Sequence, residues 1–158
     1  MKRKNIAGLI AIAAIAAMAM FSGCIEEEAT TSTDIYASDE IVISTMKSVL
    51  ADNGIQGVDI EVVDTRNKGG VKSLILSYES TAVTGDDMAG EIGTILGTYL
   101  GAKEGGWNVD ELNVVVGDRK GAAVGMWSCS KKWTDDYING KLSDTELLSN
   151  VFSSIRIL

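Results

Sequence analysis

The sequence predicts an α+β domain in which a four-stranded, mainly antiparallel sheet packs against helices, in the order helix, hairpin, helix, hairpin, helices. Two patterns lead to this prediction. Apolar residues recur at helical spacing in several stretches, and between these stretches they alternate with polar residues at the period of two that is typical of strands with one buried face. The 158 residues include 17 glycines and no proline, so glycine, asparagine and aspartate must form the turns.

The first half of the domain is predicted to be one helix followed by one hairpin. Ser38 is a suitable N-cap, and the two acidic residues after it complement the dipole of a helix that ends at Asn53 and Gly54. The apolar stripe of this helix consists of Val42, Met46, Val49 and Leu50. The hairpin turns at residues 67–70, and its alternation predicts one buried face. The predicted buried positions are Val58, Ile60 and Val62, then Leu74, Leu76 and Tyr78.

The second half repeats this order. Thr84 and Asp87 resemble a capping box for a helix that ends at residues 105–106. A hairpin that turns at residues 118–121 follows this helix. Its predicted inward residues are Leu112, Val114 and Val116, then Val124 and Met126. Ser130 is expected to cap a short helix, and Ser143 with Glu146 forms an S-x-x-E capping box for the last helix.

The amino terminus has the pattern of a secretion signal. Residues 2–4 are basic, and residues 6–21 form an uncharged apolar run that is shorter than the roughly 20 residues of a transmembrane helix. The run ends in Phe21, Ser22, Gly23 and Cys24. This ending resembles the lipobox of prokaryotic lipoproteins, archaeal ones included, with phenylalanine where leucine is usual.

The resemblance implies that residues 1–23 are a signal peptide and that Cys24, the first mature residue, carries a lipid. The protein would then be anchored in the cell membrane and face away from the cytoplasm. The alternative is an uncleaved signal anchor in which Cys24 is incidental. Residues 24–37 are predicted to be a flexible tether, because an acidic triplet and a Thr/Ser run show no periodicity. Residues 38–158 are then a single domain.

Composition excludes several classes of function. The chain has no histidine, which removes Ser-His-Asp and Cys-His catalysis and the histidine-bearing zinc sites. All 22 acidic residues follow Cys24 and three of the 14 basic ones precede it, so the part beyond Cys24 carries a net charge of −11. Nucleic acid is therefore not an expected partner. No motif points to a metal or to another cofactor, and two cysteines provide no disulfide framework.

A stripe of small residues runs along one side of the second predicted helix. Gly93, Gly97 and Gly101 repeat every four residues, and each glycine costs a helix interior about 0.5 to 1 kcal/mol relative to alanine. We expect compensation from a closely packed backbone, either the protein's own sheet or its last helix. The alternative is a partner helix or a homodimer that uses this groove.

The far face of the sheet is a second candidate surface. Alternation places Trp127 there with the small residues Ala123 and Gly125, a combination that predicts a shallow recess for a ligand or partner. If the terminal helices cover this face, the same residues are ordinary packing.

Catalytic candidates are few. Cys129 lies at the predicted start of a lysine-rich helix, which favours a reactive thiolate, but without a partner base a buried, inert thiol is the competing interpretation. The pairs Asp86-Asp87 and Asp135-Asp136 are adjacent in sequence, so their side chains diverge on a helix and do not converge on a substrate.

The sequence therefore favours a membrane-anchored binding module for a protein partner or a small ligand. The alternatives are an extracytoplasmic enzyme that uses carboxylates or Cys129, and a structural protein of the cell envelope. The element order resembles that of type III secretion chaperones, which bind partner proteins on their surfaces, although the resemblance is topological and includes no shared motif.

Overall fold

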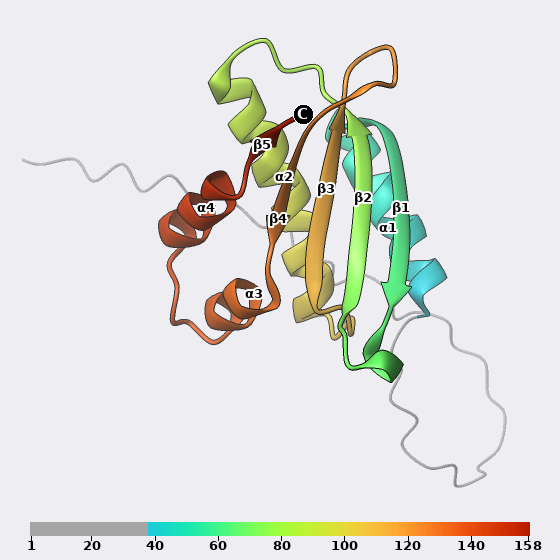
Figure 1. The fold of residues 1–158 in the computed structure, drawn as a ribbon, viewed down its shortest axis with the longest axis vertical. Helices are drawn as coiled ribbons and strands as arrows, with labels where there is room; N and C mark the ends of the chain where they lie inside the picture. Colours follow the sequence, from blue (N-terminus) through green and yellow to red (C-terminus); the bar gives the residue numbers. More distant parts are fainter. Residues whose placement is uncertain (1–37) are drawn as a thin grey trace, which may run out of the picture. The chain divides into compact units, whose positions relative to one another are not determined.

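A computed structural model of the chain describes residues 38–158 (Figure 1). Its elements follow the predicted order of helix, hairpin, helix, hairpin and helices, with one short strand after the last helix. In chain order they are α1 (Asp39–Asp52), β1 (Gln56–Asp64), the 3-10 turn η1 (Arg66–Lys68), β2 (Lys72–Glu79), α2 (Gly85–Glu104), β3 (Glu111–Gly117), β4 (Ala123–Cys129), α3 (Lys131–Ile138), α4 (Asp144–Ser153) and β5 (Arg156–Ile157).

The strands form one five-stranded sheet in the order β1-β2-β3-β4-β5. Both predicted hairpins are antiparallel, and the short β5 adds an antiparallel strand beside β4. The central pair β2 and β3 is parallel, because α2 returns the chain to the end of the sheet from which β2 started. The predicted α+β class is confirmed, with a fifth strand and one parallel pair that the sequence patterns did not predict.

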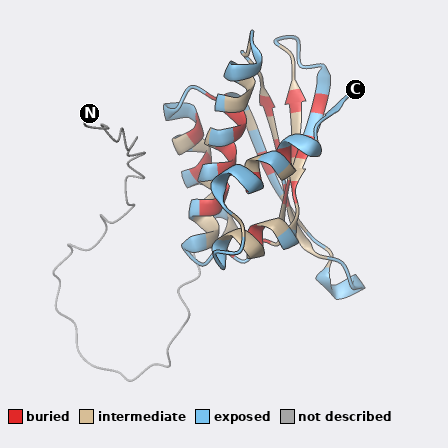
Figure 2. Cartoon of the chain, turned by 90° about the vertical axis from the view of Figure 1, so that its left-hand side faces the viewer, coloured by how far each residue is buried: buried red, intermediate tan, exposed pale blue. Residues whose placement is uncertain are grey.

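The helices lie on one side of this sheet. α1 packs against β1 and α2, α3 contacts β3, and α4 contacts β4. The apolar side chains of all four helices join those of the strands in one core, which the edge-on view in Figure 2 shows between the helices and the strands. No helix within residues 38–158 covers the opposite face of β1, β2 and β3 (Figures 1 and 2).

The predicted inward residues of β1, β2 and β3 are confirmed, but those of β4 are wrong by one position. Val114 pairs with Trp127 and Val116 with Gly125, so Trp127 faces the core with a side chain that is 3% exposed, and Gly125 faces it too. Val124 and Met126 point the other way and are 41% and 38% exposed. A register shift between β3 and β4 next to Val116 decides which residues of β4 face the core, because a shift of one residue moves every side chain of a strand to the opposite face.

Side-chain caps fix three of the helix starts. Thr84 and Asp87 form the predicted capping box of α2, and Ser143 and Glu146 form that of α4. Ser130 accepts a hydrogen bond from the Trp133 amide at the start of α3. Local sequence signals therefore placed these helix starts correctly.

The outer edge of β4 is closed by the last residues of the chain. The Oγ atom of Ser154 accepts a hydrogen bond from the Ser128 amide (2.9 Å) and lies 3.0 Å from the Ser128 carbonyl oxygen. Further along, β5 pairs with Gly125 and Met126, and the Leu158 amide donates to the Val124 carbonyl. The backbone groups of this edge are thereby satisfied within the chain.

Candidate functional site

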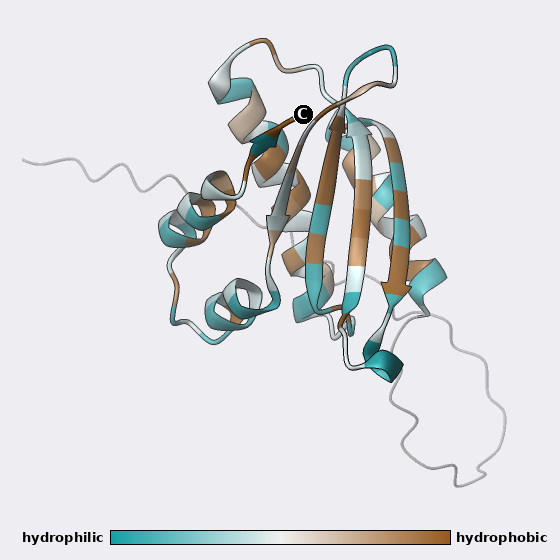
Figure 3. Ribbon diagram, viewed as in Figure 1, coloured by the Kyte–Doolittle hydropathy of each residue, from teal (hydrophilic) through white to brown (hydrophobic). Residues whose placement is uncertain are grey.

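The uncovered face of the sheet is the candidate site, and we call it the open face. It consists of the outward-pointing positions of β1 to β4, which alternate with the core positions along each strand. Figure 3 shows the resulting apolar and polar bands along the strands. The outward residues are Asp59, Glu61, Val63, Ser73, Ile75, Ser77, Glu79, Glu111, Asn113, Val115, Val124, Met126 and Ser128.

Four apolar side chains cross the open face obliquely, and we call them the apolar diagonal: Val63, Ile75, Val115 and Met126. Val63 is paired with Ser73, two residues before Ile75, and Val115 is paired with Ser77, two residues after Ile75. Such diagonal neighbours lie within reach of one another's side chains. Met126 is the direct partner of Val115 on β4. The diagonal therefore links four strands over about 19 Å, from strand spacing and rise.

Carboxylates flank this diagonal on both sides. By register, Asp59, Glu61 and Glu79 lie on one side and Glu111 on the other. Lys47 of α1 forms an ion pair with Asp59 (Nζ–Oδ1 3.0 Å), and its hydrogen bond and charge lower the pKa of that carboxyl group.

The other three carboxylates of the open face lack such a partner. Glu111 accepts hydrogen bonds from Ser73 Oγ (2.8 Å) and Asn113 Nδ2 (3.2 Å), both of them uncharged groups. Within residues 38–158, no lysine or arginine forms an ion pair with Glu61, Glu79 or Glu111. The open face therefore combines apolar side chains with unneutralised negative charge.

The structure corrects the predicted recess around Trp127. Trp127 and Gly125 lie on the helix-covered side, and only Ala123 is exposed, at the start of β4. The prediction is therefore wrong for Trp127 and Gly125, whereas Ala123 is paired with Gly117, an outward position of β3. Gly125 has a packing reason instead, because a Cβ atom there would lie 3.3 Å from the Arg156 carbonyl oxygen of β5.

The glycine stripe of α2 faces outward. Gly93, Gly97 and Gly101 are exposed, and a Cβ atom at any of them would have no heavy atom within 4 Å outside its own helix backbone. The expected packing of this stripe against the sheet or the last helix is therefore wrong. The opposite side of α2 faces the core, with Ile92, Ile95, Leu96 and Tyr99.

Cys129 has the environment of an inert thiol. It is fully buried, its Sγ atom lies 3.4 Å from Thr134 Oγ1, and burial raises the pKa of the thiol. A raised pKa keeps the sulfur protonated and disfavours the nucleophilic thiolate.

Three of the four aspartates in the acidic pairs make structural contacts, and Asp86 is exposed in the first turn of α2. Asp87 accepts backbone hydrogen bonds in the α2 capping box, Asp135 pairs with Lys131, and Asp136 pairs with Lys132. In the part of the chain that the structure describes, no group of three or more acidic or cysteine side chains is placed to hold a metal ion.

Two contacts that the sequence analysis missed involve buried or half-buried carboxylates. Glu91 of α2 is 9% exposed and accepts hydrogen bonds from Ser80 Oγ (2.7 Å) and from the Thr81 amide (2.9 Å). It fixes the loop between β2 and α2. Burial of the ring, and after it the negative charge of Glu91, raises the pKa of the neighbouring Tyr78. The sequence offered one signal of this buried role, namely a glutamate on the apolar side of a predicted helix.

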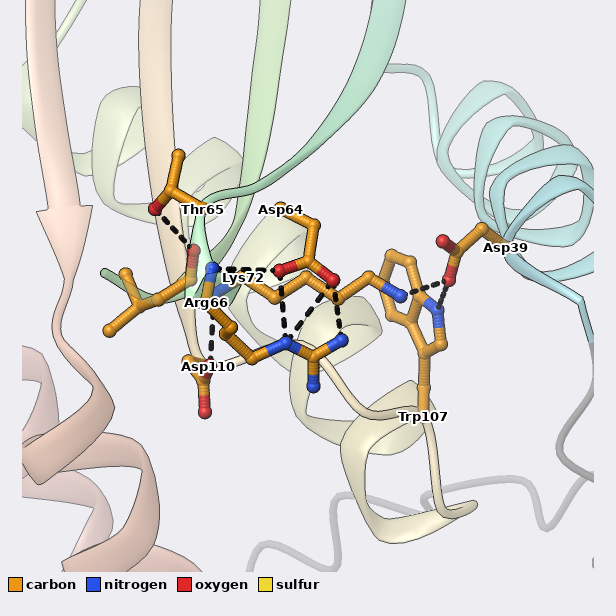
Figure 4. A network of polar contacts seen from close by, with 8 residues as sticks. Asp39, Asp64, Thr65, Arg66, Lys72, Trp107 and Asp110 are labelled. Carbon is orange, nitrogen blue, oxygen red and sulfur yellow. Dashed lines mark hydrogen bonds and ion pairs between the residues drawn. The ribbon is translucent and has the colours of Figure 1, made fainter. Parts of the chain in front are cut away.

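The second missed contact is a polar network at the start of α1 (Figure 4). Asp39 Oδ1 accepts hydrogen bonds from Lys72 Nζ (2.7 Å) and Trp107 Nε1 (2.8 Å). Partial burial alone would raise the pKa of Asp39, but these two hydrogen bonds together lower it. Asp110 accepts from the Lys72 amide (2.9 Å) and pairs with Lys131 (3.0 Å). The network joins the beginnings of α1, β2 and β3.

The surface also has two shallow depressions. One is lined by lysines, aspartates and Asn139 of α3 together with Lys141, and the other by polar residues between the end of α1 and the start of α2. Both are open to solvent. They lack the enclosed apolar walls that small-molecule sites usually have.

Comparison with known proteins identifies one family. A profile of the DUF8159 family, described as a domain of unknown function, matches residues 37–157. No curated protein and no solved structure matches the chain.

Proposed function

The chain belongs to the DUF8159 family, a domain of unknown function, and from that premise we propose that it is a lipid-anchored, extracytoplasmic module that binds a protein partner through the open face of its sheet. The observation that carries this proposal is the uncovered face of four strands with the apolar diagonal across it. Sheets of single domains usually keep their apolar side chains on the covered face, and exposed apolar groups rimmed by polar residues mark interaction sites.

The shape of the surface favours a protein over a small ligand. The diagonal spans about 19 Å on a sheet face, from the strand geometry. Ile75 and Met126 are 36% and 38% exposed, so their side chains are available to a partner. An extended face of this kind matches a second polypeptide, whereas a small molecule needs a concave site.

The contacts of the titratable groups favour binding over catalysis. An enzyme needs a nucleophile or an acid and base that converge on one point. The thiol of Cys129 is buried in the core, and three of the four candidate aspartates pair with lysines or cap a helix. These groups stabilise the fold in the positions they occupy.

The membrane anchor rests on the sequence alone, because Cys24 and the tether over residues 24–37 lie outside the described residues. Within residues 38–158, none of the helices has the length and apolar character that crossing a bilayer requires. A lipid on Cys24 would hold the domain at the membrane, and a fully extended tether would reach up to roughly 50 Å.

Site-specific photo-crosslinking in intact cells tests the binding surface. A photoreactive amino acid is placed at Ile75 or at Met126, and as a matched control at Ile41, which is 61% exposed on α1. We expect one discrete adduct of protein size from Ile75 and Met126 and none from Ile41. Adducts from Ile41 alone, or none from any of the three positions, would contradict binding through the open face.

Replacement of Cys24 tests the anchor. The Cys24→Ser variant should lose the lipid and move from the detergent phase to the aqueous phase, or stop maturing, because two signals (a cleaved peptide and an acylated cysteine) depend on this residue. Cys129→Ser serves as the control and should still enter the detergent phase. If Cys24→Ser stays in the detergent phase with an unchanged mass, the segment is an uncleaved signal anchor.

A further inference from the structure

We infer that the partner presents a basic apolar segment, in which lysine or arginine side chains stand beside apolar ones. This inference rests on the proposed function and names the chemistry of its partner. It follows from the charge of the open face, from the position of that charge beside the apolar diagonal, and from the exclusion of other occupants.

The charge of the open face is one-sided. The outward positions of β1 to β4 include four carboxylates and no lysine or arginine. Lys47 neutralises Asp59, and Arg156 of β5 stands opposite Met126 at the edge of the sheet. Three carboxylates are left without a cation among the residues that the structure places. Cations from a partner would pair with them at no cost to an existing ion pair.

The carboxylates lie where cations of such a segment would meet them. Glu61 is the direct cross-strand neighbour of Ile75, so a carboxylate flanks the middle of the diagonal. Glu111 flanks the other side, beside Ser73. A strand-like segment of about six residues would cover the roughly 19 Å of the diagonal. Successive side chains of a strand point to opposite sides, so the residues of the segment that face the sheet must be of both kinds. The apolar ones would contact Ile75 and Val115, and the cations would reach Glu61 and Glu111.

The same charges disfavour the other occupants of a flat face. A second copy of this chain, docked face to face, would bring carboxylates against carboxylates, because a two-fold axis matches each surface with itself. Nucleic acids and anionic lipid headgroups would meet the same repulsion. A basic protein segment is the occupant whose charge complements the face.

Peptide titration tests this inference. The mature lipidated protein is held in nanodiscs of zwitterionic lipid, and the probes are fluorescent eight-residue peptides. One peptide repeats the unit Val-Val-Lys-Lys, so that each side of an extended strand carries both valine and lysine; the second repeats Val-Val-Glu-Glu and the third Ser-Ser-Lys-Lys. We expect fluorescence anisotropy to detect binding of the valine–lysine peptide only, with an affinity that falls as the salt concentration rises.

Paired variants separate a specific face from general attraction to an acidic protein. The Glu61→Gln, Glu111→Gln double variant should lower the affinity for the valine–lysine peptide roughly tenfold. The control Asp52→Asn, Glu104→Gln removes the same charge at exposed helix ends and should change the affinity less than about twofold. Ile75→Thr, which keeps a β-branched residue in the strand, should also weaken binding, whereas Ile41→Thr on α1 should not.

The outcomes distinguish this inference from the proposed function. An equal loss in the two double variants, or equal binding of the serine–lysine peptide, would overturn the basic apolar segment. A variant counts only if its circular dichroism spectrum and melting curve show a folded domain. Crosslinked adducts from Ile75 and Met126 together with a failed peptide titration would overturn the inference and leave the proposed function standing.

Discussion

The two faces of the sheet use the same strands in opposite ways. On the covered face, Leu74, Leu76, Leu112 and Val114 are at most 1% exposed and pack against the helices. On the open face, their neighbours are a mixture of apolar, small polar and acidic side chains, and no helix of the described chain covers them. The comparison teaches that one face of each strand maintains the fold, whereas the other is free to change without loss of folding.

The largest expected effect is a difference in stability between substitutions at two neighbouring residues of β4. Trp127→Ala should lower the free energy of unfolding by about 3 to 5 kcal/mol, because it leaves a cavity in the core. Met126→Ala, on the open face, should cost less than about 1 kcal/mol. Urea unfolding followed by circular dichroism measures both. Similar losses for the two variants would show that the open face is covered in solution.

The next largest effect concerns the start of α1 on the covered side of the sheet, where Asp39 accepts hydrogen bonds from Trp107 and Lys72. Asp39→Asn should cost about 1 kcal/mol at neutral pH, because a charge-assisted contact is lost at a site that solvent partly screens. Asp52→Asn, at the exposed opposite end of α1, is the control and should leave unfolding unchanged.

The pH dependence of this contact has a definite sign. The pKa of Asp39 is lower in the folded domain than its ordinary value near 3.8, so the folded state favours the ionised form. The stability that this group contributes is complete above that ordinary pKa and is lost as the pH falls through the folded value. The free-energy difference between wild type and Asp39→Asn should therefore shrink on acidification below about pH 4. A difference that stays constant down to pH 2 would show that charge plays no part.

The smallest expected effect tests the outer side of α2. Gly97→Ala should raise the free energy of unfolding by about 0.5 to 1 kcal/mol, because alanine favours the helix and meets no neighbour at this position. Gly125→Ala is the contrasting variant. Its new methyl group approaches the Arg156 carbonyl, so it should destabilise the domain. A loss of stability in Gly97→Ala would reveal a contact on the glycine stripe, as a homodimer would make.

Local signals in the sequence account for most of the fold. Capping at Thr84 and Ser143 and the alternation in β1, β2 and β3 depend on neighbours within a few residues, and the structure confirms them. Which alternate residues of β4 face the core could not be predicted in this way. Val124 and Met126 alternate as regularly as Trp127 and Cys129, and the register shift beside Val116 decides between the two sets.

Much of the candidate site was beyond sequence reasoning for the same reason. The alternation predicts which residues of β1, β2 and β3 point away from the core, but the apolar diagonal depends on the parallel register of β2 with β3, which no turn signal specifies. The contact between Asp39 and Trp107 joins residues 68 positions apart. The outward glycine stripe, in contrast, was foreseeable, because Ile92, Ile95, Leu96 and Tyr99 occupy the other side of the same helical wheel.

The serine that closes the edge of β4 limits how copies of this domain can associate. An unpaired strand edge is a template for adding further strands, and such addition continues from copy to copy until a fibre forms. Ser154 and β5 occupy hydrogen-bonding groups of β4, so the edge strand in that direction is the two-residue β5, a much shorter template than β4. Where many copies are close together, addition of strands from neighbouring copies is therefore limited on this side of the sheet, and the open face of each copy stays available.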